Sequence, residues 1–550
     1  MAVVLVQVDD ELRLVDPENG VSTLLTLPDD VAIDGTRRMS VASLKLGAAI
    51  VNAPSRNLYL TSSFGLILLN PSKPSTALTA GLGAAGNLTG DYQWAVSFIH
   101  KDGDDNVLSE SAMSALSTAV AFTADAASLT AIPVSADTDT VTGRRLYRTL
   151  SGGSVLYFLA DIDDNTTTTY TDDATDASLN ILAENGHRTA EIDGTNASDE
   201  FRLRYIVSWK NRLWALSENP AERDNVLYTE DGLPYRWGST AALNELPAYP
   251  EGQDIVGVVG MAPRKDQLGV LKRTGVWQIT GDSDLSFHIV QIAFGKNGCI
   301  SDRSIVVIGD KEAFWHAPDG VVLWDNSGVN SITDSTVAPW FKTDRYFNRE
   351  FFEQSFGKYN EIRDAYDLHL VHVDEEEEDS QYWVSYNRTT RAWYGPHKTD
   401  LSGINFNAAT KVETEFGVPK VLVGGDDGII YTLTPDTYHD GSATAIALDV
   451  LTQKFNCDTP NIEKEFGELD VLTRVETING TLGITATLEH VERDDPNDTV
   501  TLGVELTQGR ERCGRLGTGR SVQLEFTQSD LDQPCTLEGF ELPFAEIGTR

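Results

Sequence analysis

The sequence predicts an all-β protein: a β-propeller with an inserted immunoglobulin-like or fibronectin type III-like sandwich and a C-terminal β-sandwich. Helix signals are scarce, whereas short alternating apolar runs separated by Gly, Asn and Asp turns recur along the whole chain. A hairpin pattern rich in Trp and Tyr fills the middle of the chain, and different strand patterns lie on either side of it. The expected segments are N-terminal strands contributing to the propeller (1–80), the inserted sandwich (81–182), the propeller (183–435) and the C-terminal sandwich (436–550).

The N-terminal segment contains one clear hairpin, Asn57–Leu69, in which Gly65 stands between two apolar runs. This hairpin has the same form as those of the predicted propeller, yet it lies before the predicted sandwich. We therefore expect the sandwich to be inserted into the propeller.

The stretch Gly81-Leu-Gly-Ala-Ala-Gly86 fits the dinucleotide fingerprint G-x-G-x-x-G, which works only between a buried strand and a helix. Two prolines and small polar residues precede it, and Tyr92, Trp94 and Val96 alternate after it as in a half-buried strand. The strand and the helix that the fingerprint requires are therefore both missing from the pattern. We predict no cofactor here and interpret Gly81–Gly86 as a flexible connection into a β domain.

The strand signals of the predicted insert are spaced as in a sandwich. The Thr-rich segment Asp163–Asp173 contains groups that bind calcium or carry glycans, but a Thr-rich final strand is the plainer interpretation. Earlier strands are expected at Tyr92–Ile99, Leu129–Val134, Arg144–Thr149 and Val155–Ile162.

The predicted propeller consists of degenerate hairpins with Gly at the turn and Trp or Tyr beside it, as in blades that bury their faces against one another. Short helices are expected between Asp334 and Phe356, because Pro339 and Gly357 limit their length. The hairpins are Asn211–Leu216, Leu268–Ile279, Glu312–Trp324, Tyr382–Trp393 and Val421–Tyr431.

After about Pro435 the hairpin pattern gives way to longer alternating strands. Asn479-Gly480 is a type I′ turn signal, and it is followed by Leu482, Ile484, Ala486 and Leu488 on one face. A second alternating run contains Val522, Leu524 and Phe526. These runs predict the C-terminal sandwich.

Charge is the unusual property of the composition. The chain has 43 Lys and Arg against 83 Asp and Glu, which gives a formal net charge of −40. Such a charge repels nucleic-acid phosphates at long range, so a groove that grips DNA is not expected. An acidic surface also serves solubility alone, and halophilic adaptation produces the same bias.

Cysteine usage and the N-terminus predict a soluble protein made in the cytoplasm. Cys299, Cys457, Cys513 and Cys535 show no C-x-x-C spacing, so we expect reduced core thiols and no zinc ribbon. The first residues lack a basic region and meet Asp9 and Asp10 at once, unlike a secretory signal. No apolar run approaches the ~20 residues that cross a bilayer.

Motifs of catalysis and metal binding are absent from the sequence, which has no P-loop, nucleophile elbow, H-E-x-x-H or EF-hand loop. His369 and His372 would lie on opposite faces of a strand, so we interpret both as structural. The segment Thr229–Trp237 is faintly like a sialidase Asp-box turn, but its spacing fails. We expect that the chain is not an enzyme and binds neither a cofactor nor a metal. We interpret Gly424–Gly428 as a turn.

The acidic run Asp374–Asp379 lies between two strand signals. A solvated hairpin tip is its simplest interpretation. If several copies face a common axis, the same run forms a ring of negative charge and becomes a candidate element of a channel. Its members are Asp374, Glu375, Glu376, Glu377, Glu378 and Asp379.

Several blocks of the chain, taken in order, resemble a known family. Ala85–Phe98, Val141–Thr149, Tyr157–Ala160 and Asn165–Asp172 resemble the fibronectin type III-like module of phage tail proteins. The remaining blocks resemble the tail nozzle proteins of short-tailed bacteriophages. They are Asn211–Trp214, Leu227–Gly232 with Trp237, Gly275–Ile279, Tyr386–Trp393, Gly519–Leu524 and Leu537–Leu542.

The resemblance implies a structural virion protein of the tail. Known nozzles are rings of six subunits that dock below a portal and an adaptor protein, and they form the last stretch of the channel through which the genome leaves. The implied partners are further copies of the chain, the tail adaptor, and viral DNA that passes without specific binding. Tail fibres and the host cell envelope are further partners that the resemblance leaves open. The family has no catalytic residues to transfer.

Two other functions stay open at this point. A carbohydrate-binding adhesin with a receptor-binding propeller would stack exposed Trp and Tyr on sugars, although core packing explains most of the ten Trp. A propeller glycoside hydrolase ranks third, because a fold alone does not fix function.

Overall fold

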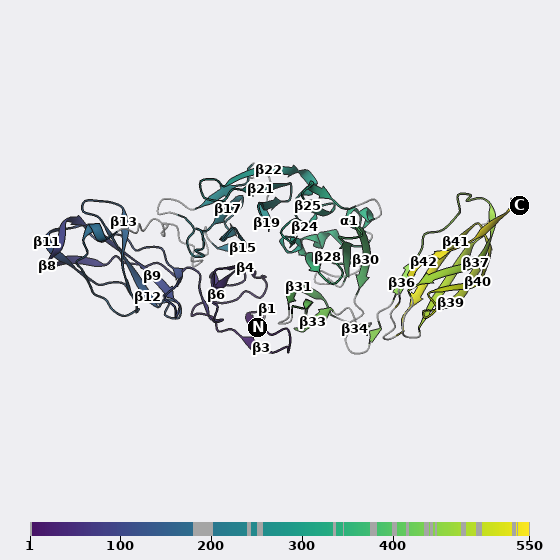
Figure 1. Cartoon of the computed structure of the whole chain (residues 1–550), viewed down its shortest axis with the longest axis horizontal. Helices are drawn as coiled ribbons and strands as arrows, with labels where there is room; N and C mark the ends of the chain where they lie inside the picture. Colours follow the sequence, from purple (N-terminus) through teal and green to yellow (C-terminus); the bar gives the residue numbers. More distant parts are fainter. Residues whose placement is uncertain are drawn as a thin grey trace. The chain divides into compact units, whose positions relative to one another are not determined.

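A computed structural model of the chain is shown in Figure 1. The residues that it describes are 3–179, 202–238, 244–249, 257–333, 337–344, 346–373, 382–398, 404–413, 417–433, 439–440, 444–445, 448–474, 480–490, 498–530, 535 and 537–548.

The chain is all-β, with a β-propeller, an inserted sandwich and a C-terminal sandwich. Within the described residues the propeller comprises seven small sheets, of which the first and last have three strands and the others four. The first two sheets precede the insert. They consist of β1 (Val4–Val8), β2 (Glu11–Val15) and β3 (Ser22–Leu24), and of β4 (Ser40–Leu44), β5 (Gly47–Val51), β6 (Leu58–Leu60) and β7 (Leu66–Leu68).

Five sheets follow the insert, and each is a meander of consecutive strands. The third and fourth are β15 (Leu203–Trp209), β16 (Arg212–Ser217), β17 (Asn225–Tyr228), β18 (Glu245–Pro247), and β19 (Val258–Pro263), β20 (Leu268–Lys272), β21 (Gly275–Thr280), β22 (His288–Phe294). The last three are β23 (Val306–Ile308), β24 (Glu312–Ala317), β25 (Gly320–Asp325), β26 (Gly328–Ser331); β27 (Phe356–Asn360), β28 (Ala365–Leu370), β29 (Tyr382–Asn387), β30 (Ala392–Lys398); and β31 (Phe406–Glu413), β32 (Pro419–Gly425), β33 (Ile430–Leu433).

Aromatic residues fill the spaces between neighbouring sheets, which is why Trp and Tyr recur beside the turns. Trp214 on β16 stacks on Tyr228 with ring centroids 4.8 Å apart and meets Phe287 of the next sheet edge-on at 5.1 Å. Phe314 on β24 stacks on Tyr366 of β28 at 5.2 Å. Each small sheet therefore buries its faces against its neighbours, as propeller blades do.

The helical segments are short, as predicted. The α-helix α1 spans Ala338–Lys342 with Pro339 in its first turn, and the 3₁₀ helix η5 spans Arg349–Gln354. Both pack against the core between the fifth and sixth sheets through Phe341 and Phe352. Among the described residues no helix has the length and apolarity needed to cross a membrane.

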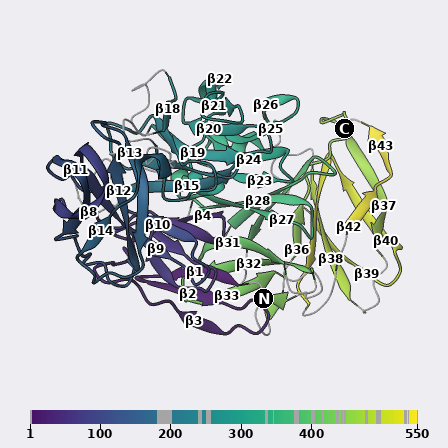
Figure 2. The same ribbon diagram turned by 60° about the vertical axis from the view of Figure 1, so that its left-hand side comes forward.

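The inserted sandwich has two antiparallel sheets, whose strands are labelled in Figure 2. Gly81–Gly86 lies inside the long strand β8 and not in a flexible connection, so that interpretation was wrong. A Cβ at Gly86 would lie 2.6 Å from the backbone nitrogen of Ala126, so glycine allows the two strands to approach. The sheets are β8 (Thr79–Tyr92), β11 (Val120–Thr130) and β14 (Tyr170–Asp172), and β9 (Trp94–Lys101), β10 (Val107–Glu110), β12 (Gly143–Thr149) and β13 (Leu156–Ile162).

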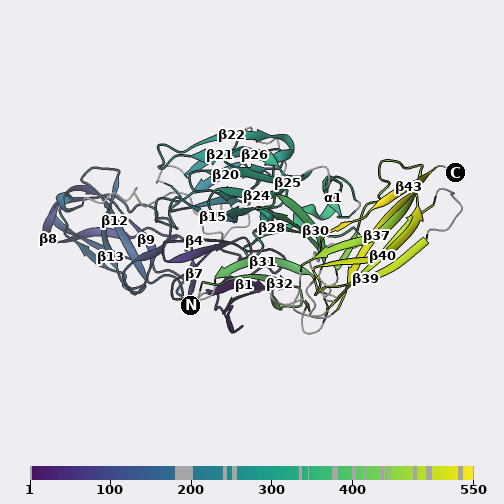
Figure 3. The same cartoon turned by 45° about the vertical axis from the view of Figure 1, so that its right-hand side comes forward.

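The C-terminal sandwich also has two four-stranded sheets, seen in Figure 3. Leu482, Ile484 and Ala486 are buried on one face of β38, and Phe526 and Leu524 of the adjacent strand β41 are the cross-strand partners of Ile484 and Ala486. Asn479 lies outside the described residues. The strands are β36 (Leu448–Leu451), β37 (Glu463–Thr473), β38 (Thr481–Glu489), β39 (Asp498–Glu505), β40 (Arg510–Gly519), β41 (Ser521–Gln528), β42 (Leu537–Glu541) and β43 (Phe544–Gly548), with the small pair β34 (His439–Asp440) and β35 (Thr444–Ala445) before them.

Candidate functional site

The predicted acidic channel element, Asp374–Asp379, lies outside the described residues, so its candidacy stays a prediction. The strands on either side of it, β28 and β29, pair antiparallel with Leu370 opposite Tyr382.

The two neighbouring histidines take part in separate aromatic stacks. His369 lies between Phe356 and Trp383, with ring centroids 4.3 and 5.5 Å away. His372 stacks on Tyr382 at 4.4 Å. Across the described ranges no group of three potential metal ligands comes together. The imidazoles therefore pack as flat rings and do not converge on a common point.

The Thr-rich segment of the insert forms an Asx turn before its last strand, β14. The Asp164 carboxylate accepts hydrogen bonds from the backbone nitrogens of Thr166 and Thr167, both at 2.6 Å, and from the Thr167 hydroxyl. The Thr167 hydroxyl and these backbone N–H groups hold the pKa of Asp164 well below its usual range. The carboxylate thus stabilises the turn itself.

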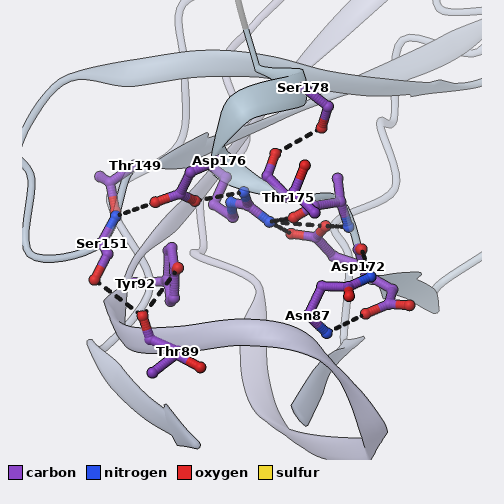
Figure 4. A network of polar contacts seen from close by, with 12 residues as sticks. Asn87, Thr89, Tyr92, Thr149, Ser151, Asp172, Thr175, Asp176 and Ser178 are labelled. Atoms are coloured by element: carbon purple, nitrogen blue, oxygen red, sulfur yellow. Dashed lines mark hydrogen bonds and ion pairs between the residues drawn. The ribbon is translucent and has the colours of Figure 1, made fainter. Parts of the chain in front are cut away.

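A buried ion pair lies at the centre of the insert (Figure 4). Arg148 on β12 and Asp172 on β14 are both fully buried, and Nη1 of Arg148 lies 2.9 Å from Oδ2 of Asp172. The indole Nε1 of Trp94 donates to the same oxygen at 2.9 Å, and Asp176 accepts from Nη2 of Arg148 at 3.0 Å. This network joins the two sheets of the sandwich.

A second buried carboxylate, Glu110 on β10, connects the insert to the propeller. Its Oε1 accepts from the hydroxyls of Ser97 at 2.7 Å and Tyr147 at 2.9 Å. Its Oε2 lies 3.4 Å from Nη2 of Arg236, which lies between β17 and β18 of the third propeller sheet. Burial beside this carboxylate raises the pKa of Tyr147 well above its ordinary value.

Neutral hydrogen bonds strengthen the same junction. The side-chain nitrogen of Asn70 donates to the backbone oxygens of Glu110 at 3.0 Å and of Tyr235 at 2.8 Å. Arg56 of the second sheet forms an ion pair of 2.9 Å with Asp137 of the insert. Because these contacts are buried or nearly so, they fix the orientation of the insert on the propeller.

The innermost strands of the propeller are linked by arginines. Arg204 on β15 donates to the backbone oxygen of Val258 on β19, and Arg303 donates to the backbone oxygen of Gln354. Arg38, just before β4, donates to the backbone oxygen of Asn407 on β31, which also accepts from Arg303 at 3.4 Å.

These links define what fills the propeller axis. Arg38 lies just before the second sheet and Arg303 just before the fifth, and both guanidinium groups donate to the backbone oxygen of Asn407 in the seventh sheet. Because these sheets are not neighbours in chain order, we infer that the three residues meet around the axis. Lys420 of the seventh sheet also donates to the backbone oxygen of Pro17 in the first sheet at 3.2 Å, which ties the ends of the ring together. Guanidinium groups therefore occupy the axis at this level.

Sequence reasoning did not identify Glu110, the Arg148–Asp172 pair or the axial arginines. One signal was present: Arg144 and Arg148 alternate with Leu146 on one face of an expected strand, and a charge on an apolar face indicates a buried partner.

Comparison with known proteins gives little beyond the fold. No protein-family model and no curated protein matches the sequence. PorZ, a surface component of the type-IX secretion system of Porphyromonas gingivalis, is a similar solved structure, with 10% identity over 99% of this chain and 80% of PorZ and a TM-score of 0.28. AztD from Citrobacter koseri has 9% identity over 78% of this chain and 93% of AztD, with a TM-score of 0.30. The extracellular domain of BT4673 from B. thetaiotaomicron has 10% identity over 99% and 71%, with a TM-score of 0.27. Similarities of this size carry no argument about function.

Proposed function

We propose that the chain is a structural virion protein, a subunit of the tail nozzle of a short-tailed bacteriophage. The observation that carries the proposal is the order of the parts. The propeller is interrupted after its second sheet by a fibronectin type III-like sandwich and is followed by a second sandwich. The same succession underlies the sequence resemblance to tail nozzle proteins.

The filled propeller axis supports a channel built between subunits. Duplex DNA does not fit through an axis at which Arg38 and Arg303 both donate to the backbone oxygen of Asn407. A conduit for DNA then requires several copies around a common axis. We propose a homo-oligomeric ring, with six subunits as in known nozzles, docked on a tail adaptor protein.

Charge supplies the mechanism of passage. With a net charge of −40, a channel wall built from this chain offers phosphates few cations to bind. DNA therefore slides past without a stable contact, both while it is retained after packaging and during ejection. The rigid junction around Glu110 would keep the insert in a fixed position on the ring wall, where fibres or the host envelope are further partners.

The adhesin alternative has less support. All ten tryptophans lie in the described part of the chain, and every one is buried or half-buried, so none presents an open ring face of the kind that stacks on a sugar. The buried carboxylates Asp172 and Glu110 offer no support for the hydrolase alternative, because arginine and hydroxyl groups already bind them. We propose that the chain is not an enzyme and uses no cofactor.

The test is the behaviour of the purified full-length chain, alone and mixed with the adaptor protein of its own phage. Native mass spectrometry should reveal a closed ring of one size, and a gel-shift titration with duplex DNA should reveal no complex at physiological salt below the ~10⁻⁴ M range typical of weak non-specific binding. A chain that stays monomeric with the adaptor, or that binds DNA tightly, would refute the nozzle proposal.

A further inference from the structure

A cavity of about 310 Å³ lies between the fourth and fifth propeller sheets. The strands of these two sheets, β19–β22 and β23–β26, are labelled in Figure 2. The cavity is at the lower end of the ~300–1,000 Å³ that ligand pockets occupy. It has room for one small ligand. The side chains that matter for its chemistry are Arg264, Gln267, Gln278, Ile292, Asp325 and Asn326.

Arg264 is the buried polar group of this cavity, with only 6% of its surface exposed. Its guanidinium lies over the ring of Trp324, 4.3 Å from the centroid. Nη1 donates to Oε1 of Gln267 at 3.3 Å and to the backbone oxygen of Asp325 at 3.4 Å, and Nη2 donates to Oδ1 of Asn326 at 3.3 Å. All three bonds are long, and Nε has no acceptor in the described part of the chain.

Further polar groups of the lining have spare capacity. The carboxamide of Gln278 on β21 makes no hydrogen bond with any described residue, and in Gln267 and Asn326 the amide oxygen, not the nitrogen, faces Arg264. Oδ1 of Asp325 accepts hydrogen bonds from the backbone nitrogen and the hydroxyl of Ser327, at 2.7 and 2.6 Å. Its second oxygen is left for another donor.

The charges in the lining select against an ion. One guanidinium, Arg264, and one carboxylate, Asp325, offset each other, so neither an anion nor a cation gains a net attraction. What the lining offers is several donors and acceptors close together, with Ile292 and Val329 as an apolar wall. Hydroxyl groups both donate and accept, and they match such a set.

We propose that this cavity binds one neutral sugar residue, with its hydroxyls on Arg264, Gln278 and Asn326 and its C–H face on the apolar wall. The site does not depend on the nozzle proposal. Because the cavity admits a single residue and the Arg264 guanidinium covers the Trp324 ring of its lining, binding is weak, with Kd of about 1 mM.

Saturation-transfer difference NMR on the full-length chain tests this site directly. The probes are methyl glycosides of glucose, galactose, mannose, rhamnose and N-acetylglucosamine, with methyl glucuronide as the charged counterpart. Gln278→Ala and Asn326→Ala each remove one carboxamide from the lining. Ser331→Ala is the matched control, because Ser331 is exposed on the same hairpin and lies outside the lining.

The proposal predicts saturation transfer to at least one neutral glycoside. Each lining variant should weaken binding about fivefold to tenfold, the usual effect of losing one or two hydrogen bonds, whereas Ser331→Ala should leave binding unchanged. The proposal is overturned if no neutral glycoside binds, if only the glucuronide binds, or if the lining variants bind as well as the control.

Discussion

The buried ion pair of the insert allows a comparison with an exposed ion pair of similar length. In the Asp172→Ala variant, the Arg148 guanidinium and the Trp94 indole N–H lose their shared acceptor inside the sandwich. Breaking a buried pair in this way costs about 3–5 kcal/mol. The control is Asp163→Ala, which removes a partner 2.7 Å from Nζ of Lys101 but 72% exposed, and this costs about 0–1 kcal/mol.

Hydrogen exchange followed by mass spectrometry measures both variants in the full-length chain. Amide protection in strands β9 and β12 reports the free energy of opening the insert. At ~1.4 kcal/mol per factor of ten, Asp172→Ala should lower this protection by more than 100-fold and Asp163→Ala by less than tenfold. Equal losses in the two variants would show that burial does not decide the strength of these pairs.

Three further predictions concern other parts of the chain. The hydrogen bond from Arg520 lowers the pKa of the Glu489 carboxyl to about 2, below its ordinary 4.5. The ionised carboxylate therefore stabilises the fold fully above about pH 5, and this stabilisation is lost as the pH falls toward 2. Glu489→Gln should flatten the acid unfolding curve of the C-terminal sandwich over that pH range. Gly298→Ala places a Cβ 2.1 Å from the backbone oxygen of Lys272, so thermal unfolding should show a loss of stability of about 1–3 kcal/mol or more. In Gly309→Ala the new Cβ has no atom within 4 Å, and the loss should be about 1 kcal/mol. Acrylamide should quench the fluorescence of the ten tryptophans weakly, and strong quenching would contradict their burial.

The hairpins of the propeller were predictable because local signals specify them. In Leu268–Ile279 and Glu312–Trp324, apolar runs flank a Gly turn, and β20–β21 and β24–β25 form where these signals lie. The buried faces of β38 and β41 followed from alternation in the same way. Period and turn chemistry act within a few residues, so a single sequence contains them.

Contacts between distant segments were not predictable from the sequence. The interpretation of Gly81–Gly86 failed because pairing with β11 overrides the flexibility of glycine. The pattern around Arg148 indicates a buried partner without saying which one, and the partners Asp172 of Arg148 and Arg236 of Glu110 come from distant parts of the sequence. The number of blades does not follow from the sequence, because the first and last sheets have only three strands and the contact between them joins residues at opposite ends of the propeller sequence.

The central claim is that copies of this chain form the wall of a channel for DNA. Cryo-electron microscopy of phage particles that contain the protein tests it most directly. The account predicts a ring of six propellers around the tail axis below the adaptor, with an acidic lumen to which the run from Asp374 to Asp379 contributes. Density that projects as a peripheral spike, or a particle without the protein, would contradict the channel, and a ring with a basic lumen would contradict the charge mechanism.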